Sequence, residues 1–127
     1  MTDPVAGAYS EHIAPLVEAM WADPQKAGYY LDLLEPLRQY DLEHHGDLVK
    51  TLWAYLRHGG NSVQTANALF IHRNSLRYRL ARIQALTSLD PDDPDARLVL
   101  QIALVLNTEL NKANPQSAFP NPKSEES

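Results

Sequence analysis

The spacing of apolar residues predicts an α-helix near the start of the chain. In residues 10–22 the apolar positions recur every three or four residues, which is the period of one helix face. They are Ile13, Leu16, Val17, Met20 and Trp21. Ser10 is expected to cap this helix. Asp23-Pro24 is expected to end it, because the residue before proline avoids helical angles. Residues 1–9 are therefore predicted to be a flexible leader.

Two more helices are expected between residues 29 and 58. The second apolar run extends from Tyr29 to Leu37 and contains Pro36, which we expect to start a new turn as a first helical residue. The next helix is predicted from about Asp47 to His58. Its apolar residues on one face are Leu48, Leu52, Tyr55 and Leu56. Gly59-Gly60 is expected to end it, because glycine has the backbone freedom that a C-cap needs.

A short helix, a tight connection and a longer helix are predicted next. Asn61 can cap the short helix, and Gln64 three residues later completes a capping-box pattern. This helix is expected to end near Leu69. Residues 70–72 then form the connection, in which His72 ends the turn or caps the longer helix at residues 73–86.

The last helix is predicted from about residue 94 to 112, after a turn rich in Asp and Pro. Asp93 can cap it, and Pro94 suits its first position. Its apolar residues lie nearly all round, so it should be buried or paired with another chain. The proline-containing stretch 113–127 is predicted to be a disordered tail. Because the chain has no strand pattern, residues 10–112 are expected to form one all-α bundle of about five to six helices.

The composition fits a single cytoplasmic domain. The chain has 127 residues, of which 44% are hydrophobic, and this suffices for one core. It has no apolar run long enough to span a bilayer and no signal-peptide layout, so we expect a cytoplasmic protein without a membrane partner. Cysteine is absent, and adjacent histidines such as His44-His45 diverge on a helix. We therefore expect no disulfide, no metal site and no cofactor.

The distribution of charge changes what the net charge of −5 implies. Residues 48–89 contain no acidic residue, and acidic residues dominate the stretches on either side. The basic residues of this stretch are Lys50, Arg57, Arg73, Arg77, Arg79 and Arg82. A polyanion responds to the local field within about a Debye length, ~8–10 Å. The stretch therefore favours a nucleic-acid partner over a merely solvated helix face.

Residues 61–84, NSVQTANALFIHRNSLRYRLARIQ, have the pattern of a helix-turn-helix. Ala66 supplies the small residue needed where two helices cross closely. Apolar anchors around the turn are Leu69, Ile71, Leu76 and Leu80. At 100° per residue, Leu76, Leu80 and Ile83 form one buried stripe on the second helix. Its polar residues face away from this stripe, as they must if the helix is to enter the major groove.

The polar residues of this motif have the chemistry that DNA requires. Arg can form two hydrogen bonds with guanine, and Asn can do the same with adenine. The residues predicted to contact base edges are Arg73, Asn74, Arg77 and Tyr78, although Tyr78 could instead be a packing residue. Those predicted to contact phosphates are Gln64, Thr65, Ser75 and Arg82. Arg79 lies beside the stripe and is expected to be structural, paired with a nearby acid. No paired nucleophile and base stands out, so we do not expect an enzyme.

One segment above all, IHRNSLRYRL at residues 71–80, carries a resemblance to a known family. Other positions that carry it are Pro36-Leu37, Tyr40-Asp41, Leu48, Thr51-Leu52, Tyr55-Leu56 and Thr65-Ala66. Residues 34–106 resemble the C-terminal helix-turn-helix domain of the PucR family of purine-catabolism and sugar-diacid regulators, and the core is similar to Fis-type proteins. The resemblance implies a dimeric bacterial transcription factor with its second helix in the major groove.

The sequence departs from the family's pattern at three positions. Ser75 stands where the family usually has Thr, and Ser88 stands where it often has Gly. Phe70 occupies a turn position where many helix-turn-helix proteins use Gly, which tolerates positive φ. Only about thirty residues precede the resembling region, and we identify no small-molecule sensor domain in this chain. It is either a fragment or a stand-alone DNA-binding protein.

Two functions stay open at this stage. The first is sequence-specific binding of double-stranded DNA by a homodimer, because one helix-turn-helix unit contacts too few base pairs to discriminate well. The alternative is a helical protein–protein interaction or dimerisation module that acts with a full-length regulator, which the acidic flanks and the apolar last helix favour. DNA affinity that falls steeply with salt would separate the two, because phosphate contacts release counterions.

Overall fold

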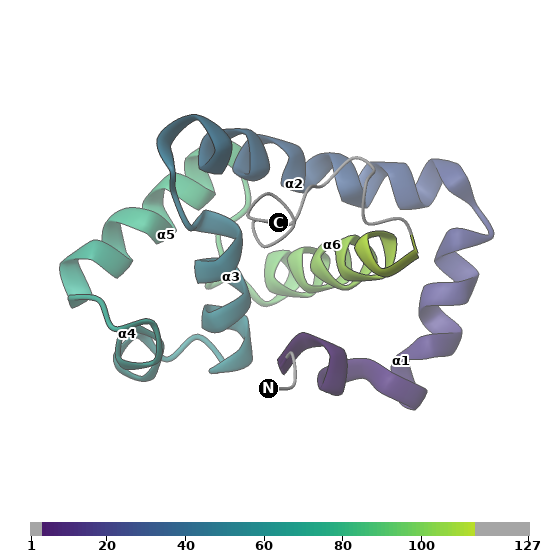
Figure 1. The fold of residues 1–127 in the computed structure, drawn as a ribbon, viewed down its shortest axis with the longest axis horizontal. Coiled ribbons are helices and arrows are strands. Elements are labelled where there is room, and N and C mark those ends of the chain that lie inside the picture. The colour runs from purple at the N-terminus through teal and green to yellow at the C-terminus, as the bar shows by residue number, and fades with distance from the viewer. Residues whose placement is uncertain (1–3, 114–127) are drawn as a thin grey trace.

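The computed structural model describes residues 4–113, which form six helices and no strand (Figure 1). The helices are α1 (Pro4–Trp21), α2 (Pro24–His44), α3 (Leu48–Arg57), α4 (Ser62–Leu69), α5 (Arg73–Thr87) and α6 (Pro94–Ala113). The predicted all-α class is thus confirmed. In Figure 1, α4 and α5 lie at one end of the molecule and α1 at the other, with α2 across the top and α6 in the middle. Of the predicted tail at 113–127, Ala113 is the last residue of α6, and the rest lies outside the described residues.

The first helix begins earlier than the sequence pattern predicts. It starts at Pro4, so the predicted cap at Ser10 is wrong, and residues 4–9 of the predicted leader are helical. Proline suits a helix start because its missing N–H would be unpaired there in any case. The predicted end holds, and Asp23 then caps α2 by accepting the N–H groups of Gln25 and Lys26 at 3.2 and 3.4 Å.

The second helix continues through Pro36, where a new turn was predicted. A proline inside a helix removes one hydrogen bond and costs about 3 kcal/mol. Leu34 and Leu37, on either side of it, are 1% and 0% exposed. Burying each leucine contributes roughly 1.5–3 kcal/mol. Burial of these two side chains therefore offsets the cost of the proline and keeps α2 in one piece.

The main core lies where α2, α3, α5 and α6 contribute buried side chains to one cluster. Its members are Leu34, Leu37, Leu48, Leu52, Leu56, Ile83, Leu100, Ala103 and Leu104. α5 takes part through Ile83 and, at its edge, through the half-buried Leu80. This cluster fixes which face of α5 points inward and which face is left for function.

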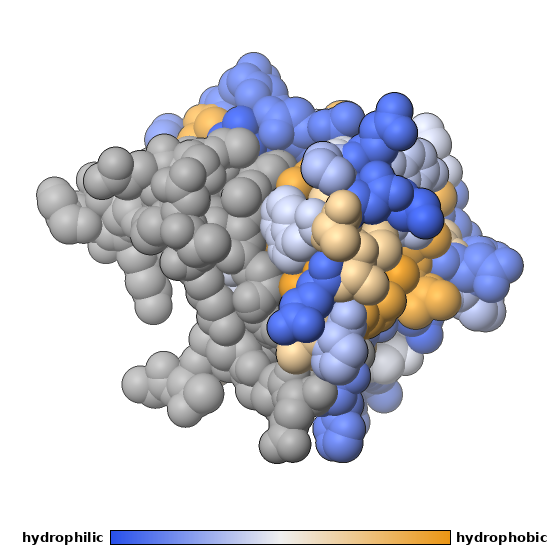
Figure 2. Space-filling view, turned by 90° about the vertical axis from the view of Figure 1, so that its right-hand side faces the viewer, coloured by the Kyte–Doolittle hydropathy of each residue, from blue (hydrophilic) through white to orange (hydrophobic). Residues whose placement is uncertain are grey.

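A second, smaller cluster joins α1 to α6. Val17 and Leu106 are buried there, and Val105 packs beside them. The apolar side chains of α6 are therefore covered largely by helices of the same chain, by α2 on one side and by α1 on another. Leu98 of α6 is still 60% exposed. At the α1 end of the molecule an apolar area lies among hydrophilic side chains (Figure 2). In the described part of the chain, no helix is long and apolar enough to cross a bilayer.

Candidate nucleic-acid interface

The start of α4 is held by the predicted asparagine cap. The Asn61 side-chain oxygen accepts the N–H of Gln64 at 2.9 Å, while the Asn61 N–H donates to the His58 carbonyl at 3.0 Å, so only half of the capping box forms. Thr65 is 0% exposed, and its hydroxyl donates to the Asn61 carbonyl at 2.7 Å. A buried hydroxyl that is already bonded cannot reach a phosphate, so Thr65 leaves the set of candidate contacts. Gln64 is exposed and stays in it.

The connection between α4 and α5 has the geometry that glycine usually supplies. Phe70 ends α4 with a φ of 58°, and its side chain is 94% exposed. The N–H of Ile71 donates to the Ala66 carbonyl at 3.0 Å, which closes the turn. His72 then caps α5 as predicted, because its Nδ1 accepts the N–H of Asn74 at 2.9 Å.

The predicted buried stripe of α5 is confirmed. Leu76 and Ile83 are 1% and 0% exposed, and Leu80 is half-buried. Ala66 of α4 is 2% exposed, as expected of the small residue at a helix crossing. α5 is thereby fixed in rotation, and its opposite face is turned to solvent.

The outward face of α5 carries a basic and amide-rich surface at its N-terminal end. The exposed residues predicted for DNA contact there are Arg73, Asn74, Ser75 and Arg77. The Arg77 guanidinium donates to the Asn74 side-chain oxygen at 3.5 Å, so these two side chains lie together. Three of the four predicted base-reading residues, Arg73, Asn74 and Arg77, therefore lie within about one and a half accessible turns of α5.

The fourth, Tyr78, belongs to a different arrangement farther along α5. Its hydroxyl accepts a hydrogen bond from Arg82 Nη2 at 2.9 Å. The Arg82 guanidinium carbon lies 5.4 Å from the centre of the Tyr78 ring and 5.7 Å from the centre of the Tyr40 ring. Hydrogen bonds with Arg82 and Tyr40 lower the pKa of Tyr78, and the hydrogen bond with Tyr78 raises the pKa of Tyr40. Tyr40 is in α2, outside the motif, and sequence reasoning did not assign it to the site.

Arg79 and Asp41 hold the surrounding helices in place. Arg79 is structural, as expected: its Nη1 donates to the Thr51 hydroxyl at 3.0 Å, and its charge interacts with the nearby Asp41 carboxylate. Asp41, near the end of α2, accepts the N–H groups of Leu48 and Val49 at 2.8 and 3.1 Å and so caps α3. Burial raises the pKa of Asp41, and these two hydrogen bonds act in the opposite direction.

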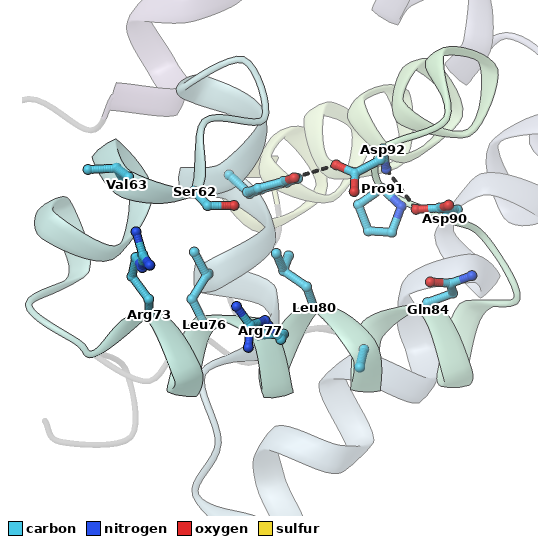
Figure 3. Close-up of a pocket in the computed structure, with 12 residues that line it drawn as sticks. Ser62, Val63, Arg73, Leu76, Arg77, Leu80, Gln84, Asp90, Pro91 and Asp92 are labelled. Carbon is cyan, nitrogen blue, oxygen red and sulfur yellow. Dashed lines mark hydrogen bonds between the residues drawn. The ribbon is translucent and has the colours of Figure 1, made fainter.

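A cleft of about 390 Å³ runs beside the basic face of α5 (Figure 3). Arg73 and Arg77 line it from α5, and Asp90 and Asp92 line it from the turn before α6. The cleft thus has a basic side that belongs to the candidate DNA surface and an acidic side that does not. Within residues 4–113, no three His, Asp or Glu side chains gather closely enough to hold a metal ion.

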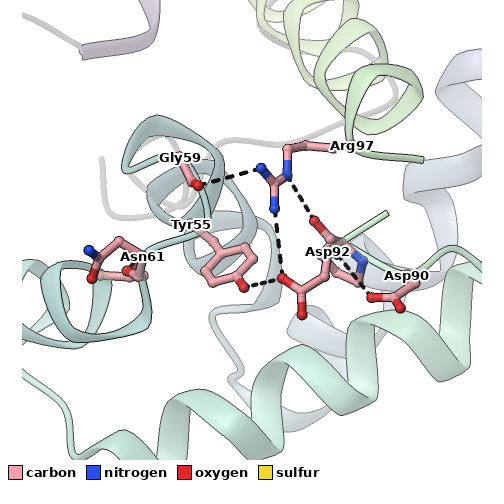
Figure 4. A network of polar contacts seen from close by, with 8 residues as sticks. Tyr55, Gly59, Asn61, Asp90, Asp92 and Arg97 are labelled. Carbon is pink, nitrogen blue, oxygen red and sulfur yellow. Dashed lines mark hydrogen bonds and ion pairs between the residues drawn. The ribbon is translucent and has the colours of Figure 1, made fainter. Parts of the chain in front are cut away.

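The acidic side of the cleft is fixed by a polar network (Figure 4). The Tyr55 hydroxyl donates to the Asp92 carboxylate, and Arg97 lies 3.7 Å from the same carboxylate oxygen. Arg97 also donates to the carbonyls of Pro91 at 3.0 Å and Gly59 at 3.4 Å. Burial, followed by the hydrogen bond to Asp92, raises the pKa of Tyr55 to about 12. The network joins the end of α3 to the start of α6.

Together these features define a helix-turn-helix protein in which α5, the second helix of the motif, exposes a basic surface. Residues 48–106 match the family model of the PucR C-terminal helix-turn-helix domain. Over these residues the chain is therefore similar to that family, as the resemblance in the sequence predicted.

Three curated relatives are similar to part of the chain. The chain is 47% identical over 79 residues to the carbohydrate diacid regulator of Escherichia coli (strain K12), which covers 61% of this chain and 20% of that protein. It is 39% identical over 70 residues to the proline-responsive transcriptional activator PutR of Bacillus subtilis (strain 168), covering 55% of this chain and 17% of PutR.

The third relative is the DNA-binding transcriptional activator AdeR of Bacillus subtilis (strain 168). It is 30% identical over 82 residues, which cover 65% of this chain and 19% of AdeR. The matched region thus spans a fifth or less of each of these three relatives. No solved structure matches the chain significantly.

Proposed function

We propose that this chain binds double-stranded DNA sequence-specifically, as the DNA-binding part of a bacterial transcription regulator, with α5 in the major groove. The observation that carries the proposal is the outward face of α5, where Arg73, Asn74 and Arg77 are exposed while the opposite face is fixed in the core. The similarity of residues 48–106 to the PucR helix-turn-helix family, and relatives named as transcriptional activators, support it. Such a protein acts in the cytoplasm by binding, not as an enzyme.

The proposed contacts divide by chemistry. Arg73, Asn74 and Arg77 are assigned to base edges, because guanidinium and amide groups can form paired hydrogen bonds with guanine and adenine. Gln64 and Ser75 are assigned to phosphates. Ser75 lies in the first turn of α5, where free backbone N–H groups and the helix dipole also attract an anion.

Selection of bound duplexes from a random-sequence pool, followed by fluorescence anisotropy at several salt concentrations, tests the proposal. Arg77→Ala should weaken binding to the selected duplex by roughly 1–3 kcal/mol and relax the preference at one base pair. Lys26→Ala is the matched control, because it removes one exposed positive charge at the far end of α2. Its affinity should equal that of the wild-type protein.

Either of two results would contradict the proposal. A folded Arg77→Ala variant with wild-type affinity and preference would remove Arg77 from the base-reading set. A wild-type protein without salt-dependent affinity for any duplex would instead favour the protein-interaction module.

We further propose that two copies bind DNA as a symmetric dimer. A helix-turn-helix dimer places its two units on half-sites about one DNA turn apart, ~34–36 Å, and so doubles the sequence that is read. Val105 packs in the α1–α6 cluster of its own chain. It is thus part of the monomer core, and Val105→Asp should lower helix content instead of separating two folded copies. Sedimentation with and without a palindromic duplex measures the assembly, and a monomer in both samples would rule the dimer out.

A further inference from the structure

We propose that Tyr40, Tyr78 and Arg82 act as one phosphate-binding unit, in which the Tyr78 hydroxyl donates to a DNA phosphate and the other two are positioning residues. The inference rests on the proposed DNA-binding function and adds to it a residue of α2 that lies outside the helix-turn-helix. It also changes two predictions from the sequence, in which Tyr78 contacts a base and Arg82 contacts a phosphate directly.

The hydrogen bonds at the Tyr78 oxygen leave one direction open. The oxygen accepts a hydrogen bond from Arg82 Nη2 at 2.9 Å. Tyr40 also hydrogen-bonds to this oxygen, and our proposal assigns Tyr40 as the donor. A phenol oxygen has two lone pairs and one proton. With both lone pairs engaged, the proton of Tyr78 is left to donate outward, and the side chain is 55% exposed.

A single outward donor suits a phosphate better than a base. Base recognition relies on paired donors and acceptors, whereas a phosphate oxygen only accepts and carries negative charge. The positive charge of Arg82 lies directly behind the Tyr78 hydroxyl, which makes that proton a stronger donor to an anion. Tyr78 is also one turn beyond Arg73 and Asn74, past the N-terminal end of α5 that is best placed to enter the groove.

The packing of Arg82 explains why it positions Tyr78 instead of reaching the phosphate itself. Its Nε atom is buried without a hydrogen-bond partner, and its Nη2 atom is directed to the Tyr78 hydroxyl. Its guanidinium carbon lies within 6 Å of both ring centres, at 5.4 and 5.7 Å, a separation at which a cation is attracted to an aromatic face. Tyr40 therefore orients Arg82 through its ring and Tyr78 through its hydroxyl.

The test compares the affinity of Tyr→Phe variants for a selected duplex and for a scrambled duplex of the same length. Tyr78→Phe should weaken binding about tenfold, and by the same factor on both duplexes, because a phosphate contact does not depend on sequence. Tyr40→Phe should weaken both by a smaller factor. The double variant should bind like Tyr78→Phe alone, because Tyr40 acts through Tyr78. Tyr29→Phe, which alters an exposed tyrosine at the start of α2, is the control and should bind like the wild-type protein.

A second measurement separates positioning from general structure. Carbon-13 tyrosine NMR can follow the ionisation of Tyr78, whose hydroxyl is faced by Arg82 and Tyr40. Removing the Tyr40 hydroxyl should raise the pKa of Tyr78, while circular dichroism shows unchanged helix content.

Several outcomes would overturn the inference while leaving the proposed function standing. One is wild-type affinity in Tyr78→Phe. A loss confined to the selected duplex would make Tyr78 a base reader, and additive effects in the double variant would mean that Tyr40 does not act through Tyr78. An unchanged Tyr78 titration in Tyr40→Phe would also count against it. Failure of the wild-type protein to bind either duplex would instead refute the proposed function itself.

Discussion

At the scale of single residues, three helices end on a non-glycine residue with positive φ. His45, Phe70 and Ser88 have φ values of 51°, 58° and 64° and follow α2, α4 and α5. This conformation costs an L-residue roughly 1–2 kcal/mol. Glycine at the position of Ser88 would avoid this cost, because it has no Cβ. Phe70 and Ser88 therefore keep the left-handed turn geometry without glycine, at the cost of this backbone strain.

Phe70 is the position where this cost should be easiest to measure. Its side chain is 94% exposed, so replacing it removes almost no packing. Phe70→Asn should raise stability by about 0.5–1 kcal/mol, because asparagine tolerates the left-handed region better. Thermal unfolding followed by circular dichroism measures the change. Equal or lower stability would show that the Phe70 ring contributes to the fold.

At the scale of helices, caps formed within a few residues follow from the sequence and caps formed between helices do not. Asn61, His72 and Asp93 cap the helices that they directly precede, as predicted. Asp47 directly precedes α3 yet makes no side-chain cap, because Asp41 of α2 occupies that role from the neighbouring helix. Local spacing cannot report such a contact, since it depends on how α2 and α3 pack.

This pair of aspartates gives a direct comparison. Asp41→Ala should destabilise the protein by about 1–2 kcal/mol, the usual cost of losing a cap, because the N–H groups of Leu48 and Val49 lose their acceptor. Asp47→Ala should change stability by less than about 0.5 kcal/mol. Urea unfolding of both variants measures the difference. The expectation fails if Asp47→Ala proves to be the more damaging change.

At the scale of the whole molecule, the same limit applies to the site. Residues 61–84 alone are enough to predict the position of the helix-turn-helix, the buried stripe of α5 and the exposure of Arg73, Asn74 and Arg77. Helical periodicity determines all three features. The position of Tyr40 beside Tyr78 could not be predicted in this way. Nor could the polar network that joins the end of α3 to the start of α6. Both arise only when distant segments pack together.

The network at the start of α6 should make stability sensitive to alkaline pH. The pKa of Tyr55 is raised to about 12 in the folded protein, whereas an unperturbed tyrosine ionises near 10. Between these values the unfolded chain binds fewer protons than the folded one, so stability should fall as pH rises. Tyr55→Phe should make this fall shallower, and Tyr29→Phe should not. Denaturant midpoints between pH 9 and about 11.5 measure it. Parallel curves for the wild-type protein and Tyr55→Phe would contradict the assignment.

The continuity of α2 through Pro36 bears on where this DNA-binding region can be cut. The family match begins at residue 48, yet α2 supplies Leu34 and Leu37 to the core and Asp41 to the cap of α3. The stretch that the family model matches is therefore shorter than the smallest stretch that should fold autonomously. A protein engineer who grafts this region onto another scaffold should begin the transferred segment at Asp23, so that it includes the whole of α2.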